Sequence, residues 1–129
     1  MSDNLTTVPK WVTIYLWVTV AITLGASIAG YLAPDALFGG WEALSAGGAL
    51  SLAGPVGLFI SRNLGTAIVG IYSLTQKNTS MIKLYLILRV AEDGIDFIHN
   101  IIAGNMQVAI MAIVMCAIEI FALTKVKYV

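Results

Sequence analysis

This sequence has few charged residues: Asp, Glu, Lys and Arg together make up 11% of its 129 residues. Soluble domains carry about 25% of such residues, so the composition argues against a soluble globular protein. The seven basic residues are balanced by seven acidic ones. This balance leaves no strongly basic face for phosphate groups, and we predict no nucleic-acid partner.

Cysteine and histidine are almost absent as well. Cys116 is the only cysteine and His99 the only histidine. A lone cysteine excludes a disulfide within the chain, and the spacing of the two residues is not that of a metal site. We therefore expect Cys116 to be a small buried residue, and we predict neither a metal ion nor another cofactor. No combination of Ser or Cys with His and an acid suggests nucleophilic catalysis.

Long apolar runs are what the sequence has in abundance, because 59% of its residues are hydrophobic. A helix that crosses a bilayer needs about 20 mainly apolar residues. Four segments meet this requirement: 11–33, 55–76, 82–103 and 106–124. The first is longer than the core of a signal peptide, so we expect it to be retained. The sequence predicts an all-α membrane protein, with one domain of four transmembrane helices packed as a bundle.

The lysines predict the topology of this bundle. Lys10 precedes the first span, Lys77 and Lys83 flank the second connection, and Lys125 and Lys127 follow the last span. All five lie on one side of the membrane if there are four spans, and the positive-inside rule makes that side cytoplasmic. We expect both termini in the cytoplasm and the protein in the cytoplasmic membrane of a prokaryote.

The connection between the first two spans, residues 34–54, mixes glycines with apolar residues. Trp41 within it is a natural anchor at a membrane interface. A short interfacial or re-entrant helix fits this composition, and so does a flexible linker.

The third predicted span contains the polar residues that point to function. At 3.6 residues per turn, six of them share about a third of the circumference of the helix. They are Arg89, Glu92, Asp93, Asp96, His99 and Asn100. Each charge near the bilayer centre costs about 2.5–3.5 kcal/mol. The charged members must therefore face the bundle interior, pair with opposite charge, or take up a proton.

Residues of other spans that lie at the same depth in the membrane are the expected partners of these polar residues. Arg62 and Asp96 each lie about 14 residues from the cytoplasmic ends of their spans, and Glu119 of the fourth span lies near the level of Arg89. Two groups of side chains are expected to result. They are Arg62 with Asp93 and Asp96, and Arg89 with Glu92 and Glu119.

Charges inside a membrane usually mark functional sites. In the first group one arginine faces two acids, and unequal carboxyls are what acid–base chemistry needs. We predict an intramembrane enzyme that acts on a lipophilic small molecule by epoxide opening, isomerisation or cyclisation. Asp93 and Asp96 would be acid and base, and Arg62 would hold a carboxylate or a substrate oxygen. The expected substrate-binding residues are Asn63, Arg89, Glu92, His99, Asn100 and Trp41.

Two other functions remain open. Buried ion pairs can simply fix helix register, as in a noncatalytic accessory or assembly subunit of a larger membrane complex. Small residues at Gly25, Ala26, Ala29 and Gly30 offer a face for a partner helix. Alternatively, the polar stripe lines the axis of a homo-oligomer that conducts protons or other ions. Membrane lipid is a partner in each case.

Short motifs add a family resemblance. Residues 31–38 read Tyr-Leu-Ala-Pro-Asp-Ala-Leu-Phe at the end of the first span, and residues 62–65 read Arg-Asn-Leu-Gly in the second. With the polar third span and the apolar fourth, this order resembles the small DoxX-like four-helix membrane proteins over residues 30–105. The resemblance implies a four-helix membrane fold and an important Arg62. It also implies, from some members of that group, an accessory role beside membrane oxidoreductases.

Overall fold

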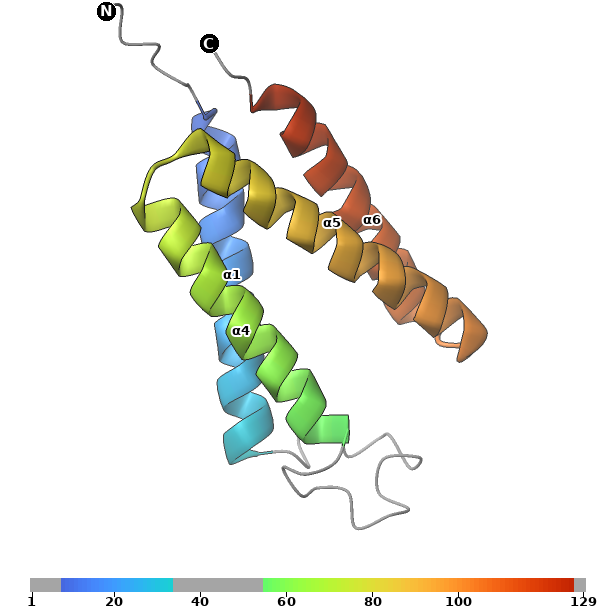
Figure 1. Ribbon diagram of the computed structural model, residues 1–129. Coiled ribbons are helices and arrows are strands. Elements are labelled where there is room, and N and C mark those ends of the chain that lie inside the picture. Colours follow the sequence, from blue (N-terminus) through green and yellow to red (C-terminus); the bar gives the residue numbers. More distant parts are fainter. Residues whose placement is uncertain (1–7, 34–54, 127–129) are drawn as a thin grey trace, which may run out of the picture. The chain divides into compact units, whose positions relative to one another are not determined.

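The computed structural model describes residues 8–33 and 55–126. Within these ranges the chain forms four helices and no strand (Figure 1). They are α1 (Lys10–Leu32), α4 (Pro55–Thr75), α5 (Thr79–Ile102) and α6 (Met106–Lys125). The all-α prediction is confirmed, and each predicted apolar segment holds one helix. Segment 34–54, with Trp41, lies outside the described residues, so the interfacial helix or linker expected there stays a prediction.

The connections around α5 explain where the helices begin and end. Asn78 caps α5, because its side chain accepts a hydrogen bond of 2.9 Å from the Ser80 N–H. This cap starts the helix three residues before its apolar run. At the other end, Gly104 has a φ of +75°, a left-handed conformation that glycine adopts without strain. Asn105 then caps α6 by accepting from the N–H of Val108.

The chain divides into two compact units. The first, the hairpin unit, contains α5 and α6 together with the described parts of residues 1–14 and the end of α4 from Ser73. The second, the central unit, is Tyr15–Tyr72 and contains most of α1 and α4. Each unit buries its own set of side chains, so each is described by itself.

In the hairpin unit α5 and α6 pack side by side and run in opposite directions (Figure 1). Two contacts fix their register: Arg89 bonds to Glu119, and the Cys116 thiol lies 3.7 Å from the backbone oxygen of Val90. The side of α6 that is buried carries mainly small residues, which let two helix backbones approach closely. These residues are Ala109, Ala112, Cys116, Glu119 and Ala122.

The first turn of α1 joins the hairpin unit at the end where α6 finishes. The ring of Trp11 stacks on that of Phe121, with centroids 5.8 Å apart and planes inclined by 27°. Because α5 and α6 are antiparallel, α5 also begins at this end. The starts of α1 and α5 and the end of α6 therefore lie together.

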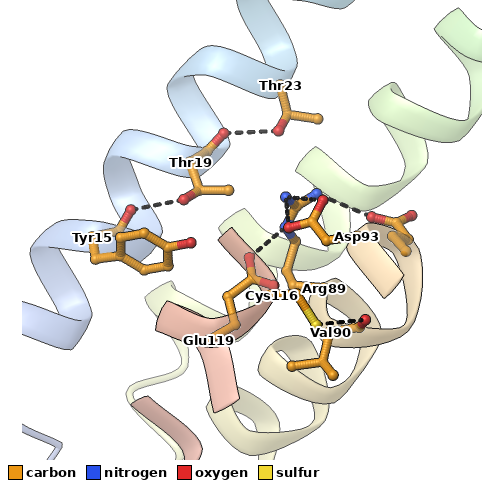
Figure 2. A network of polar contacts seen from close by, with 9 residues as sticks. Tyr15, Thr19, Thr23, Arg89, Val90, Asp93, Cys116 and Glu119 are labelled. Carbon is orange, nitrogen blue, oxygen red and sulfur yellow. Dashed lines mark hydrogen bonds and ion pairs between the residues drawn. The ribbon is translucent and has the colours of Figure 1, made fainter. Parts of the chain in front are cut away.

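In the central unit α1 has one face of buried side chains, and this face carries hydroxyl groups. The hydroxyls of Thr19, Thr23 and Ser27 each donate to the backbone oxygen four residues earlier, at 2.8–3.0 Å; Figure 2 shows the first two of these bonds. Such bonds satisfy a hydroxyl within its own helix. A cavity of about 210 Å³ with an apolar lining lies between α1 and α4 and is lined by Ser27, Ile28, Tyr31, Leu32, Ile60 and Leu64.

Two of the four helices, α1 and α6, are long and apolar enough to cross a membrane. In their most apolar stretches only 33% and 28% of the residues are buried, whereas the core helix of a soluble protein is mostly buried. The polar residues Arg62 and Asn63 lie within α4, and α5 contains five charged residues. Length and composition thus support two of the four predicted spans.

Candidate functional site

The centre of the candidate site is Arg89, on the side of α5 that is buried in the hairpin unit. Its guanidinium binds three carboxylates (Figure 2). Nη1 lies 3.1 Å from Glu92 Oε2, Nη2 lies 3.0 Å from Asp93 Oδ2, and Nε lies 3.1 Å from Glu119 Oε1. We call these four residues the Arg89 cluster.

Helix geometry explains the cluster. Glu92 and Asp93 follow Arg89 by three and four residues, the spacings at which side chains on a helix surface are neighbours. Glu119 comes from α6, at the level that the antiparallel register sets. Asp93 accepts from Nη2 with both carboxylate oxygens, at 3.2 and 3.0 Å. All three guanidinium nitrogens are therefore engaged by acids.

The cluster is buried and its charges do not balance. Glu119 is 0% exposed, and Arg89 and Asp93 are each 8% exposed. One guanidinium faces three carboxyls, which gives a net charge of −2 when all are ionised. Excess charge away from water is unfavourable by several kcal/mol per ion, and binding a proton relieves it. Chemically, the arrangement can take up and release a proton in a place that water reaches poorly.

Tyr85 extends this site, although it is not among the residues predicted from the sequence. Its side chain is 0% exposed, and its hydroxyl has no hydrogen-bond partner among the residues that the structure describes. Tyr85 belongs to the same set of buried residues of α5 as Arg89 and Asp93. A buried hydroxyl without a partner costs about 1–3 kcal/mol, so it calls for an explanation. The only signal in the sequence is its place one helical turn before Arg89.

The rest of the polar stripe is gathered less tightly. Asp96 is half-buried, one turn beyond Asp93, and is not one of the three acids that Arg89 binds. The side chain of Asn100 donates to the Asp96 backbone oxygen at 2.7 Å, and His99 is exposed. These residues continue along α5 toward its end instead of joining the cluster.

The predicted residues of α4 belong to the central unit. Arg62 is exposed there, and the side-chain amide of Asn63 donates to the Phe59 backbone oxygen at 2.8 Å. The expected group of Arg62 with Asp93 and Asp96 stays a prediction.

The other expected group, Arg89 with Glu92 and Glu119, is present in the structure. Asp93, which its depth suggested as a partner of Arg62, binds Arg89. The reason is that a partner four residues away on the same helix is always within reach.

Among residues 8–33 and 55–126, no group of three His, Cys, Asp or Glu side chains is arranged to hold a metal ion. The carboxyls, the guanidinium and the phenol of the described site can transfer protons and form hydrogen bonds.

Comparisons with protein-family models, with curated proteins and with solved structures found no match to this chain. The resemblance to the DoxX-like proteins stays an expectation that rests on the sequence motifs alone.

Proposed function

We propose that this chain is a four-span membrane protein and an enzyme whose Arg89 cluster performs acid–base chemistry on a lipophilic small molecule. The observation that carries the proposal is the cluster itself, three carboxyls on one buried guanidinium. Intramembrane charges are expensive and are retained mainly where they function.

Exposed apolar side chains support the membrane placement. On α1, Ile14 and Ile22 are 63% and 64% exposed, and on α6, Ile110 and Met111 are 57% and 62% exposed. Soluble monomers rarely expose apolar surface of this continuity, whereas in a bilayer lipid tails are the outer solvent. In this placement α5 crosses the bilayer with Arg89 paired to Glu119 of α6.

The chemistry follows from the residues that surround the guanidinium. A proton held between Asp93 and Glu119 makes one of them an acid while Arg89 keeps another carboxyl ionised. Tyr85 has a hydroxyl available to donate to a substrate oxygen, such as that of an epoxide or a carbonyl group. Asp96 serves as the base and Arg62 as a second ligand for a substrate oxygen. His99, Asn100, Asn63 and Trp41 complete the proposed substrate-binding set.

The enzyme proposal is tested inside cells, where the natural substrate is present. Lipid extracts are compared by mass spectrometry from cells that produce equal amounts of the wild type, Asp93→Asn, Glu119→Gln or Tyr85→Phe. The exposed residue Gln107 supplies a matched control, Gln107→Ala. We expect one lipid species to accumulate and another to disappear in the three site variants but not in the control. Identical extracts from all five would rule out the enzyme.

Whether the Arg89 cluster holds a protonated carboxyl is tested separately, by infrared titration of the protein in lipid nanodiscs. We expect the carbonyl stretch of a protonated carboxyl in the wild type at neutral pH, and its loss in Glu119→Gln or Asp93→Asn. A buried carboxyl with a raised pKa would titrate between about pH 5 and pH 8. If the wild type has no such band in this range, the cluster is a fixed ion network. Acid–base chemistry at this site is then excluded.

One observation favours a second function, a noncatalytic accessory or assembly subunit of a membrane complex. Every nitrogen of the Arg89 guanidinium is already bound by an acid. Two of these acids hold the guanidinium on α5 and the third, Glu119, ties it to α6, as a purely structural contact between the helices would. In this case the site variants would lower the recovery of the whole complex from membranes and leave the lipid extracts unchanged.

A further inference from the structure

The hairpin unit gathers lysines at one of its ends. Lys125 is the last residue of α6. The contacts of Arg89 with Glu119 and of Cys116 with Val90 set a register that puts Lys83 at the same level. The other two lysines of this end are Lys10, which precedes the stacked Trp11, and Lys77, which stands just before α5. We call these four lysines the basic end.

Among the described residues of the hairpin unit, no acid lies within one helical turn of these lysines in the sequence. The acids in the described part of the hairpin unit are Glu92, Asp93, Asp96 and Glu119. The nearest in sequence to a lysine of the basic end is Glu119, six residues before Lys125 and therefore about 9 Å along the helix axis. Lys10, Lys77 and Lys125 are exposed, and Lys83 is half-buried. Within the described residues the basic end carries four positive charges.

Aromatic rings stand beside these charges. Trp11 and Phe121 are 40% and 54% exposed although their rings stack on each other. The Lys125 ammonium nitrogen lies 4.9 Å from the centroid of the Phe121 ring. A tryptophan and lysines at the end of apolar helices are the combination that occupies the headgroup level of a bilayer. At that level a lysine stem packs along apolar surface while its ammonium group stays among polar headgroups.

The backbone conformation at Lys77 is unusual for a lysine. Lys77 has a φ of +50°, and its N–H donates to the Leu74 backbone oxygen at 3.4 Å as α4 ends. Glycine or asparagine is preferred in this left-handed conformation, and a long side chain is sterically disfavoured. The turn conformation therefore does not favour lysine, whereas its positive charge is favourable beside the C-terminus of α4.

From these observations we propose that the basic end binds the phosphate headgroups of anionic phospholipids, with Trp11 and Phe121 against the adjoining acyl chains. A phosphate diester accepts hydrogen bonds from several ammonium groups, and each lysine near an anionic surface adds to the attraction. This binding does not depend on the acid–base site and concerns only the end of the hairpin unit.

The test uses the full chain in detergent micelles, with phosphatidylglycerol or phosphatidylcholine added at equal concentration and bound lipid counted by native mass spectrometry. We expect phosphatidylglycerol to bind preferentially. The triple variant Lys10→Gln, Lys77→Gln, Lys125→Gln should lose this preference, by about fivefold for each lysine, while Gln107→Ala keeps it. Equal binding of both lipids to the wild type, or an unchanged preference in the triple variant, would overturn the proposal.

Two further arms separate the causes. Lys77→Gly removes the charge and relieves the strain of the positive φ. It should therefore raise the thermal unfolding temperature and still weaken phosphatidylglycerol binding. Unchanged binding would count against a role for this lysine. Inorganic phosphate at millimolar concentration should not displace the lipid. If it does, the basic end recognises free phosphate and the lipid proposal is wrong.

Discussion

A single guanidinium with three acids makes the side chains of the Arg89 cluster unequal in importance. Arg89→Met removes the only cation of the cluster and leaves three buried carboxyls together. We expect it to lower the free energy of unfolding by about 3–5 kcal/mol. Glu119→Gln keeps the shape of the side chain and removes one excess negative charge from the least exposed acid. We expect this substitution to change stability by less than about 1 kcal/mol.

Equilibrium unfolding in mixed micelles measures both changes. The double variant, Arg89→Met with Glu119→Gln, should recover part of the loss, because fewer carboxyls are then left without a cation. If Glu119→Gln proves as damaging as Arg89→Met, the three acids are all needed in their ionised form, and the cluster holds no excess charge to relieve.

At the scale of helices, substitution of exposed glycines in α4 and α1 tests whether a partner protein packs against these helices. Gly65 and Gly25 have open space around the position of a Cβ atom, with no atom within 4 Å. Alanine fits there and favours a helix by about 0.5–1 kcal/mol over glycine. We therefore expect Gly65→Ala and Gly25→Ala to raise the thermal unfolding temperature of the isolated protein.

The same variants address the accessory-subunit function when they are made in cells. A partner helix that packs closely on these glycines would be pushed away by a methyl group. Co-purifying proteins should then be lost from the alanine variants although the chain itself is more stable. A chain that becomes less stable in isolation would show that these positions are packed within the protein.

Helix positions were the part of the fold that the sequence predicted best. A search for runs of about 20 mainly apolar residues located α1, α4, α5 and α6 to within three residues. The start of α5 was misplaced because Asn78 supplies its first turn from outside the apolar run. Depth counting found the pair Arg89 and Glu119, since the rise per residue is uniform along a helix.

The rotation of each helix about its own axis was harder to predict than the level of a residue along the helix. The direction in which Arg62 points depends on the tilt and packing of α4, which a single sequence does not specify, so its expected partners stay a prediction. Tyr85 was missed for another reason. An isolated tyrosine in an apolar helix looks like ordinary core, and only the burial of its hydroxyl distinguishes it.

For the whole molecule, the lysines predict which ends face the cytoplasm. The structure places the starts of α1 and α5 and the end of α6 together in the hairpin unit (Figure 1), so these ends share one side of the membrane in the proposed four-span protein. We expect an impermeant thiol reagent added outside intact cells to label a cysteine introduced at Ala43 but not one at Gln76. The experiment uses a Cys116→Ala background. The reverse labelling would show that the lysines face outward and that the topology is inverted.

The division of the Arg89 cluster between two helices bears on how the chain is made. In the proposed four-span protein, translation would deliver α5 to the membrane before α6, and α5 alone carries five charged residues, too many for it to enter lipid readily. Glu119 arrives with α6, after a connection of only residues 103–105 and about one to four seconds of further synthesis. The two helices should then enter the bilayer together, as a preformed pair. A chain that stops at Asn105 should leave α5 at the surface, where an added protease can cut it.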